Sequence, residues 1–401
     1  MIYSLKNKDI IVFGLQPWDI EIGSNCKNIA LELSKNNRVL YVNRALDRLS
    51  IIRNKHDPKI QSRLKALNDN KIDIEEVETN LFVFNPSTVL ESIAKIPFNY
   101  VFNKLNYLNN KRISKEILKA ANSLGFSTPV LFIDNEFFRA YYLKELIPNQ
   151  LFIYYIRDYL VEQDYFKTHG KRLESDLIRK ADLVVTNSIH LADYASDYNR
   201  NSFFIGQGCD LSLFDPEKET DQPADMINIK KPIIGYVGAL VTSRLDLELL
   251  EYLALNKTDW SFVLVGPEDM AFRESTLHSL ENVHFPGPQP KNELAKYIKE
   301  FDVCINPQIR NSQTEGNYPL KIDEYLAMGK PVVATYTRAM EMFEDYVYLA
   351  RNKFEYLDNL KKALSDIDER LSSEGIRLAK SHTWKNCIEN LEKAISKAQN
   401  E

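Results

Sequence analysis

The sequence predicts an α/β protein with two doubly wound, Rossmann-like domains. The chain has 401 residues, which exceeds the size at which a single hydrophobic core normally keeps growing. Short apolar runs bounded by turn residues alternate with segments of helical periodicity, as is typical of parallel βαβ units. A polar, proline-containing stretch at 215–225 has no apolar period and separates two such series. We therefore expect two parallel sheets with helices on both faces.

The expected elements follow from the apolar runs and their periodicity. In the first half, strands are predicted at 9–14, 38–42, 81–84, 130–133, 151–156 and 183–186, and helices at 24–34 and 111–123. In the second half, strands are predicted at 232–237, 261–265, 283–285, 303–306, 331–334 and 346–349. These elements predict a first domain at 1–215, a linker at 216–230, a second domain at 231–382 and a last helix at 383–401.

The composition is that of an ordinary soluble protein, with 44% hydrophobic and 27% charged residues. No apolar run approaches the ~20 residues of a membrane span, and the start lacks a signal-peptide stretch, so we expect a cytoplasmic protein. Four scattered cysteines argue against a zinc site or disulfide framework. A net charge of −5 argues against a nucleic-acid binder. Asp366-Ile-Asp368 lies in a polar helical pattern, so no metal or other cofactor is expected.

The most informative stretch runs from Asn317 to Thr335. It places Lys321 and Glu324 in the first turns of an expected helix that leads into a buried strand. The unpaired N–H groups and positive dipole end of a helix start favour an anion, and Lys321 adds a full charge. Glu324, one turn later on the same face, can accept hydrogen bonds from ribose hydroxyls. Gly329 is expected to end the helix. The pattern indicates a nucleoside diphosphate site.

The same stretch resembles the donor-binding segment of retaining glycosyltransferases with the two-domain GT-B architecture. It is most similar to bacterial glycosyltransferases of surface and capsular polysaccharide assembly, such as the teichuronic-acid type. Further segments of the family occur in the expected order, namely Gly206-Gln-Gly-Cys-Asp210, Gly235-Tyr-Val-Gly238, Phe262-Val-Leu-Val-Gly266-Pro267, Asn282-Val-His-Phe-Pro-Gly287, Phe301-Asp-Val-Cys-Ile-Asn-Pro307 and His382-Thr-Trp384. The likeness covers residues 200 to 390 well and the N-terminal half in outline.

The resemblance implies two domains that face each other across a cleft, with the last helix crossing back onto the first domain. A nucleotide sugar would bind the second domain, because positive groups at the leaving phosphate oxygen lower the barrier. Lys321 and Arg244 are the expected cations, and Leu320 is expected to contact the donor. Gly238 lets the phosphate approach the backbone. The base, which the similarity suggests is uracil, is expected against Gly266, Pro267, Gly287 and Gln289, although these segments are also compatible with plain turns.

One position departs from the family pattern. Many retaining relatives carry a first glutamate, which binds the sugar, at a fixed spacing before the ribose glutamate. Counting back from Glu324 reaches Gly316, whereas Glu315 is one place too early. Either a bulge brings Glu315 to the sugar hydroxyls, or the chain belongs with relatives that lack this glutamate. We favour the second interpretation.

The first domain is expected to bind the acceptor. The loop with Trp18, Gly23 and Ser24 joins the first strand to the first helix. Ser24 can cap that helix, Gly23 permits close approach, and Trp18 offers a flat face to a sugar ring or packs in the core. The strand at 151–156 ends in Arg157 and Asp158, where many relatives have His-Asp. Arg157 could stabilise the leaving phosphate and Asp158 could bind or deprotonate the acceptor hydroxyl, or the two form a strand-end ion pair.

Residues 95–112 mix aromatic residues with cations. Such a surface can dock on anionic lipid and hold the enzyme near a lipid-linked acceptor at the inner face of the membrane, or it is a helix packed on its own domain.

Taken together, the residues and the resemblance predict a metal-independent, retaining hexosyltransferase. It would move a sugar from a nucleoside diphosphate donor, with UDP favoured, onto a saccharide or lipid-linked acceptor in capsule, lipopolysaccharide or related surface polysaccharide synthesis. One alternative is a non-hydrolysing sugar-nucleotide epimerase, which shares the two-sheet architecture. Another is a catalytically silent homologue that binds a nucleotide or a partner. NAD chemistry is disfavoured because no Gly-x-Gly-x-x-Gly follows a strand.

Overall fold

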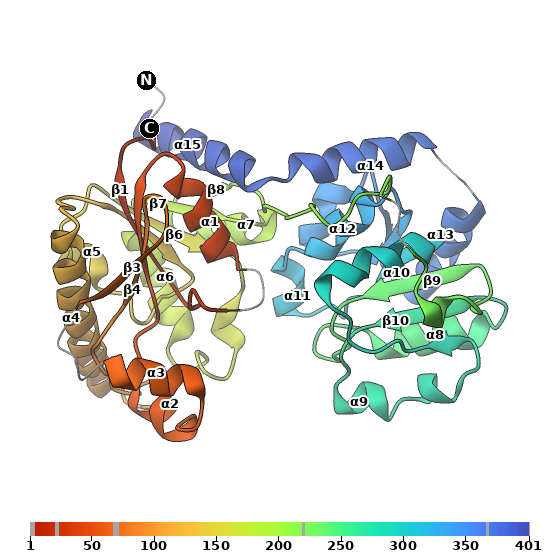
Figure 1. The fold of residues 1–401 in the computed structure, drawn as a ribbon, viewed down its shortest axis with the longest axis horizontal. Helices are drawn as coiled ribbons and strands as arrows, with labels where there is room; N and C mark the ends of the chain where they lie inside the picture. Colours follow the sequence, from red (N-terminus) through yellow and green to blue (C-terminus); the bar gives the residue numbers. More distant parts are fainter. Residues whose placement is uncertain (1–4, 21–23, 67–71, 219–220, 366–368, 401) are drawn as a thin grey trace. The chain divides into compact units, whose positions relative to one another are not determined.

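The computed structural model describes residues 5–20, 24–66, 72–218, 221–365 and 369–400. The chain divides into two compact units (Figure 1): Met1–Gly206 with Trp384–Glu401, and Gln207–Thr383. The first unit ends before the expected boundary at 215, and the expected linker at 216–230 belongs to the second unit. The physical reason is burial, because Phe214 and Met226, the apolar residues around this polar stretch, lie in the core of the second unit.

The first unit is built on one sheet with the strand order β3-β4-β2-β1-β5-β6-β7-β8. All neighbouring strands are parallel except β3, which runs antiparallel to β4. The middle strands are apolar over most of their length and buried almost throughout, because helices cover both of their faces. The strands are β1 (Asp9–Gly14), β2 (Arg38–Val42), β3 (Asp73–Glu78), β4 (Leu81–Asn85), β5 (Val130–Asp134), β6 (Leu151–Ile156), β7 (Leu183–Thr186) and β8 (Ser202–Phe204).

Helices on both faces complete the first unit. They are α1 (Asn25–Ser34), α2 (Arg48–Arg53), α3 (Pro58–Ala66), α4 (Asn99–Ser123), α5 (Leu143–Leu146), η1 (Leu160–Glu162), α6 (Gly170–Lys180), α7 (Ile189–Ser196) and α15 (Trp384–Asn400). The last helix, α15, packs beside α1 and buries Leu391 and Ile395 in the same cluster as Val12 (Figure 1). The C-terminal residues therefore belong to the first unit.

Helix α4 begins at Asn99, well before the expected start at residue 111. Its early turns bury asparagines rather than an apolar stripe. Asn109 exchanges two hydrogen bonds of 2.9 Å with the backbone of Glu91, and Asn110 donates to the carbonyl of Phe138 at 3.0 Å. The backbone partners compensate for the burial of these amides, so apolar periodicity alone misses the first half of the helix.

The second unit has a parallel sheet with the strand order β11-β10-β9-β12-β13-β14. This order reverses between β9 and β12, and in open α/β sheets ligands bind beyond the carboxyl ends of the strands at such a switch point. The strands are β9 (Ile233–Val237), β10 (Ser261–Val265), β11 (Val283–His284), β12 (Val303–Asn306), β13 (Val332–Thr335) and β14 (Tyr348–Ala350). The predicted fold of two doubly wound parallel sheets is confirmed.

The second unit has two hydrophobic clusters, one on each face of its sheet. One contains Ile298 of α10 and Tyr325 of α12, and the other contains Leu253 of α8 and Leu360 of α13. The helices are η2 (Ala224–Met226), α8 (Leu247–Asn256), α9 (Met270–Arg273), η3 (Thr276–Ser279), η4 (Lys291–Glu293), α10 (Leu294–Glu300), α11 (Ser312–Gly316), α12 (Leu320–Ala327), η5 (Arg338–Phe343), α13 (Lys353–Ser365) and α14 (Glu369–Ser381).

Cysteine and membrane-span expectations can be compared with the described ranges. The four cysteines, all among the described residues, form no disulfide; Cys26, Cys304 and Cys387 are buried and Cys209 is half-buried. Among the helices that the structure describes, none has both the length and the apolar character that crossing a membrane requires.

Candidate functional site

Helix α12 presents Lys321 and Glu324 on one side and buries the other. Ile322 and Tyr325 on the buried side are fully inaccessible and lie in the core of the second unit. Lys321 and Glu324, three positions apart, are half-buried and share the other side. Gly329 ends the helix at φ +66°, and the N–H of Lys330 bonds to the carbonyl of Tyr325 at 3.1 Å. The expected helix and its stop therefore form as predicted, with Lys321 and Glu324 on one side, and their contact with a nucleotide stays a prediction.

Gly238 and Gly266, at the tips of β9 and β10, allow their backbones to meet. A Cβ atom on Gly266 would lie 1.9 Å from the carbonyl oxygen of Gly238. Gly238 has φ +144°, and Gly266 has φ +154°, which side chains disfavour. The Cε atom of Lys321 lies 3.3 Å from where a Cβ of Gly238 would be. The structure thus brings together the predicted cation and the predicted glycine tip.

Two tyrosines that the sequence analysis missed contact Lys321 and the end of β9. The Tyr325 hydroxyl accepts a hydrogen bond from the Val237 N–H at 2.9 Å, which fixes α12 to the end of β9. The Tyr236 ring lies under Lys321, whose Nζ atom is 5.1 Å from the ring centroid. Tyr325 belongs to the Glu-Tyr-Leu-Ala run, but nothing in the spacing reveals its partner.

A buried cluster behind α12 was also missed. Asp323 is fully buried and accepts hydrogen bonds from the Tyr318 hydroxyl at 2.7 Å and from Nδ1 of His382 at 2.6 Å. Burial raises the pKa of Asp323, and its hydrogen bond to His382 opposes that rise. Because Tyr318 and His382 are far apart in the chain, spacing gives no signal for their meeting. The cluster ties the segment before α12 to the end of the second unit.

The carboxyl group of Glu324 has a raised pKa. Desolvation raises its pKa to about 7, while the positive charges of Lys321 and Lys291 lower it and the charge of Asp323 raises it. Lys291 also lies 3.8 Å from Asp210. Glu324 can therefore change between a carboxylate and a carboxylic acid near neutral pH.

Arg244 lies on the loop after β9, as expected. Its carbonyl oxygen accepts a hydrogen bond of 2.9 Å from the N–H of Ile309, on the loop after β12, and Asp246 caps α8 by accepting from Leu249 N–H at 2.9 Å. The guanidinium of Arg244 is exposed and forms no ion pair with a described residue. The structure joins its loop to the switch point, and its contact with a phosphate stays a prediction.

The loops expected to hold the base are partly closed by their own hydrogen bonds. The carbonyl of Pro267 accepts from the N–H of Leu240 at 2.8 Å. Gly287 has φ +76° with open space around it, and the side chain of Gln289 donates to the carbonyl of Pro286 at 3.0 Å. Both loops follow the ends of neighbouring strands β10 and β11, and their contact with a base stays a prediction.

Glu315 is engaged within its own unit. It lies in α11, where its Oε1 atom accepts from Arg310 at 2.9 Å and its Oε2 atom accepts from the N–H of Arg338 at 3.2 Å. These bonds give Glu315 a local role that fits the interpretation in which the first family glutamate is missing. Its reach to a sugar stays untested.

In the first unit, Trp18 and Ser24 have clear local roles, and Gly23 lies outside the described residues. Ser24 caps α1 by accepting from the N–H of Lys27 at 3.4 Å. Trp18 is half-buried, with its ring 5.2 Å from the ring of Tyr41 and Nζ of Lys27 4.6 Å from its centroid. Trp18 therefore combines core packing with a partly exposed face.

Arg157 and Asp158 form the strand-end ion pair that was the open alternative. The Nη1 atom of Arg157 donates to Asp158 at 2.6 Å, and its Nε atom donates to buried Asp134 at 2.9 Å. Asn135, at φ +52°, accepts from the N–H groups of Arg157 and Asp158 at 2.7 and 3.0 Å. Asp134 and Asn135 were missed. Arg157 is thus restrained by two carboxylates, and its action on a phosphate stays a prediction.

Residues 95–112 lie mainly on α4, and docking of this segment on lipid stays a prediction. Phe102 is fully buried, so one side packs on the domain. The other side exposes large apolar residues beside Lys104, whose Nζ atom is 4.4 Å from the ring centroid of Tyr100. The exposed residues are Phe98, Tyr100, Val101, Tyr107 and Leu108.

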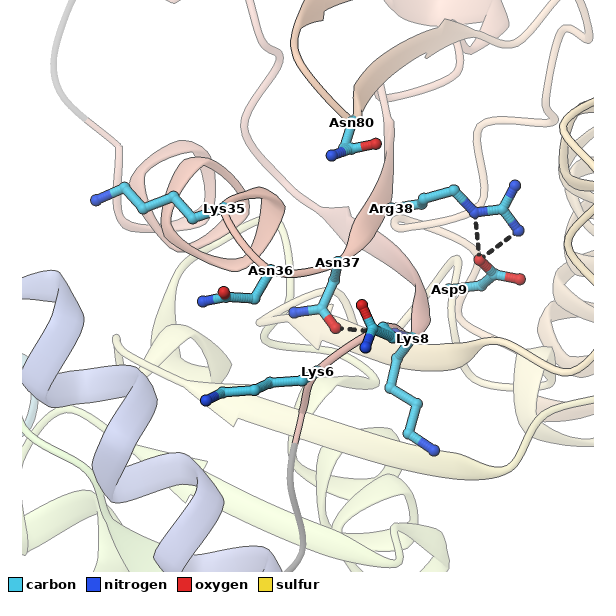
Figure 2. A pocket seen from close by; sticks show the side chains of 9 residues that line it. Lys6, Lys8, Asp9, Lys35, Asn36, Asn37, Arg38 and Asn80 are labelled. Atoms are coloured by element: carbon cyan, nitrogen blue, oxygen red, sulfur yellow. Dashed lines mark hydrogen bonds and ion pairs between the residues drawn. The ribbon is translucent and has the colours of Figure 1, made fainter.

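A cavity of about 560 Å³ opens at the amino-terminal edge of the first sheet, near Asp9 and Arg38. Figure 2 shows that the side chain of Lys8 extends in a different direction from those of Lys6 and Lys35. Arg38 is paired with Asp9 at 2.6 Å. Parallel sheets bind ligands at their carboxyl ends, so this cavity is not the candidate site. Within the described ranges, no three His, Cys, Asp or Glu side chains gather in a way that could hold a metal ion.

Comparisons with known proteins show what the chain is similar to. Residues 231–366 match the family described as "Glycosyl transferases group 1". Over 231 residues the chain is 28% identical to the Bacillus subtilis (strain 168) protein TuaH, named as a teichuronic acid biosynthesis glycosyltransferase. The match covers 54% of this chain and 57% of that relative, so the chain spans little more than half of the relative's length.

Solved structures resemble the chain over nearly its whole length. The Escherichia coli structure described as trehalose-6-phosphate bound with UDP-2-fluoro glucose has a TM-score of 0.68 at 11% identity, covering 97% of this chain and 99% of its own. Sucrose-phosphate synthase from Thermosynechococcus elongatus has a TM-score of 0.63 at 15% identity, covering 98% of both chains. Likeness at such low identity shows the fold alone, which is the expected GT-B fold.

Proposed function

We propose that this chain, a GT-B protein with a glycosyl transferases group 1 domain at residues 231–366, transfers a sugar from a nucleoside diphosphate donor to a saccharide or lipid-linked acceptor. The observation that carries the proposal is the approach of Lys321 to Gly238 at the switch point of the second sheet. A cation fixed beside a backbone that phosphate can reach is what a diphosphate leaving group needs.

The donor would lie along α12 and the tips of β9 to β11. Lys321 would neutralise the diphosphate, and exposed Arg244 would add a second charge from the loop after β9. Glu324 would accept hydrogen bonds from the ribose hydroxyls. The base would contact Gly266, Pro267, Gly287 and Gln289, with uracil favoured by the family resemblance. UDP also occurs in the name of the E. coli structure that shares the fold.

The chemical step we propose is metal-independent and retains the configuration of the sugar. The bond from the anomeric carbon to the phosphate oxygen breaks, and the electron pair stays on the phosphate. The acceptor oxygen then bonds to that carbon on the same face, and its proton passes to the leaving phosphate. Lys321 would stabilise the charge that builds on the phosphate. A chelator such as EDTA should leave the rate unchanged.

Surface polysaccharide synthesis is the proposed setting. The relative named for teichuronic acid biosynthesis supports it, as does the match of the second unit to a glycosyltransferase family. The acceptor would bind the carboxyl-end loops of the first sheet, near Trp18 and Asp158. Capsule assembly and lipopolysaccharide assembly also use glycosyl transfer and belong to the same proposed setting.

A peripheral membrane contact through α4 is part of the proposal. Phe98 and Tyr100 are 69% and 68% exposed, and Lys104 lies beside Tyr100. Exposed aromatic residues with adjacent cations favour an anionic lipid surface. Sedimentation with anionic vesicles should be lost in the double variant Phe98→Ser, Tyr100→Ser. The matched control is Phe354→Ser, which changes a 63% exposed phenylalanine of the second unit. Equal sedimentation of both variants would remove this contact from the proposal.

The decisive activity experiment is a hydrolysis screen with UDP- and GDP-sugars. Lys321→Ala should slow release of the nucleotide about 100- to 1,000-fold, which is typical for loss of one group that stabilises a developing anion. Lys361→Ala, which removes an exposed lysine paired with Asp358, is the matched control and should keep the native rate. Release that is insensitive to Lys321→Ala would contradict the proposal.

A thermal-shift panel separates the alternatives. The panel contains UDP, GDP, UMP and NAD. A glycosyltransferase should be stabilised by one of the two nucleoside diphosphates, UDP or GDP. A partner-binding homologue should respond to none of them. An epimerase should also respond to UDP, but it would convert a UDP-sugar to its epimer without an acceptor, which product analysis detects.

A further inference from the structure

The carboxyl edge of the first sheet contains a guanidinium group that forms no hydrogen bond or ion pair with a described residue. Arg44 follows β2 and is half-buried. The same segment is joined to the Trp18 loop, because the N–H of Trp18 donates to Asn43 Oδ1 at 2.6 Å. Arg44 therefore lies at the edge of the sheet where the acceptor is proposed to bind. A cation that is partly removed from water normally has an anionic partner.

The nearby carboxylates are already used by a second arginine. Arg139 is 5% exposed and donates to Glu136 at 3.0 Å and to Asp47 at 3.4 Å. Glu136 is fully buried, and its other oxygen accepts from the N–H groups of Phe138 and Arg139. The other oxygen of Asp47 accepts from Ser50 and Ser92. Both acids thus accept hydrogen bonds from Arg139 and from local donors.

The lowered pKa of Arg44 agrees with the bonding of both acids to Arg139. The charge of Arg139 is the largest cause that lowers the pKa of Arg44, followed by desolvation, and the acids Glu136 and Asp47 only partly oppose them. Tyr165, which is 40% exposed, is close enough to act electrostatically on both guanidinium groups. Its hydroxyl can donate a hydrogen bond to the same anion that the guanidinium binds.

We propose that Arg44, supported by Arg139 and Tyr165, binds an anionic group carried by the saccharide acceptor. This inference rests on the proposed glycosyltransferase function and specifies its acceptor: a sugar that bears a phosphate or a carboxylate rather than a neutral one. A planar guanidinium binds either anion through two parallel hydrogen bonds. The anion would give Arg44 the direct partner that Glu136 and Asp47, both bonded to Arg139, do not provide.

The first test needs no variant. The native chain is treated with phenylglyoxal, and modification of Arg44 is read by peptide mass spectrometry with and without each probe. The probes are inorganic phosphate, glucose 6-phosphate, glucuronate and neutral glucose. Arg44 should react, because it is unpaired, and the anionic probes should protect it whereas glucose should not. Protection by glucose 6-phosphate indicates a phosphate source, and protection by glucuronate alone indicates a carboxylate source. No protection by any anionic probe would overturn the inference.

Calorimetry of the same probes provides the second test. Arg44→Gln should weaken binding of the protecting anion about tenfold or more. Arg48→Gln, which alters an exposed arginine paired with Glu91 at 2.8 Å, should bind it as the native chain does. UDP is titrated in parallel. UDP binding without anion binding would refute this inference and leave the proposed function intact, whereas anion binding without any nucleotide binding would refute the proposed function.

Discussion

The Cε atom of Lys321 lies 3.3 Å from the position that a Cβ atom on Gly238 would occupy. Lys321 lies in the first turn of α12, and Gly238 directly follows β9, the strand before the switch point of the sheet. Their approach places a positive charge beside a backbone that has no side chain. The proposed diphosphate site depends on this pair.

Gly238→Ala should damage both the fold and the nucleotide site. The new Cβ would meet the Tyr236 hydroxyl at 2.8 Å and crowd Lys321, at a φ of +144° that alanine rarely adopts. We expect a lower melting temperature and loss of stabilisation by nucleoside diphosphates. Gly125→Ala, at φ +72° with nothing within 4 Å, tests backbone strain alone. An equal nucleotide response in the native chain and Gly238→Ala would contradict the close approach.

Tyr325→Phe should loosen α12 from β9. The substitution leaves the buried N–H of Val237 without its 2.9 Å partner, which typically costs ~1–3 kcal/mol. Urea unfolding measures this loss. Because Lys321 is carried on the same helix, the donor KM should rise and kcat should fall as well. An unchanged free energy of unfolding would show that the hydroxyl does not hold the helix.

Nucleoside diphosphate affinity should increase as pH rises through about 7. Burial raises the pKa of Glu324 to about 7, so the group is a carboxylic acid below that pH and a carboxylate above it. The carboxylate accepts ribose hydroxyl bonds more strongly. Calorimetry between about pH 5.5 and 8.5, which extends about one to two units either side of this pKa, measures the effect. Since the terminal phosphate of UDP also titrates near 6, Glu324→Gln is the control, and its remaining pH dependence belongs to the ligand. Identical profiles would contradict the role of Glu324.

Stability of the first unit should fall as pH rises from the unfolded pKa of Glu174 towards 7. This glutamate is fully buried and accepts from the hydroxyls of Tyr154 and Tyr194, and burial raises its pKa to about 7. The folded state holds the proton more tightly than the unfolded state. The contribution is therefore complete at low pH and is lost as pH rises, by roughly 3 kcal/mol. Glu174→Gln should be less pH-dependent in denaturant titrations and more stable at pH 8. A steeper loss in the variant would refute this.

The fold was predictable wherever burial is continuous. The strands β1, β6 and β10 are uninterrupted apolar runs apart from the polar first residues of β1 and β10, and their expected bounds agree with the structure. Strand β3 was missed because its sequence, Asp-Ile-Glu-Glu-Val-Glu, lies at an exposed antiparallel edge where polar residues are tolerated. The start of α4 was missed because buried asparagines use backbone partners there.

The candidate site was predictable where neighbours in the sequence share one helix, as Lys321 and Glu324 do. Contacts between distant segments were not. Asp323 meets His382 only through the fold. Arg44 is a single arginine after a strand. Its lack of an ion-pair partner follows from the structure, in which Arg139 bonds to both nearby acids.

Calorimetric titration of UDP and GDP into four proteins tests the central claim most directly. The proteins are the native chain, Lys321→Ala, Glu324→Ala and the surface control Lys361→Ala. We predict that one nucleoside diphosphate binds the native chain and the control equally, and that each of the other two substitutions weakens binding about tenfold or more. Binding that is unchanged in both Lys321→Ala and Glu324→Ala would contradict the proposed site.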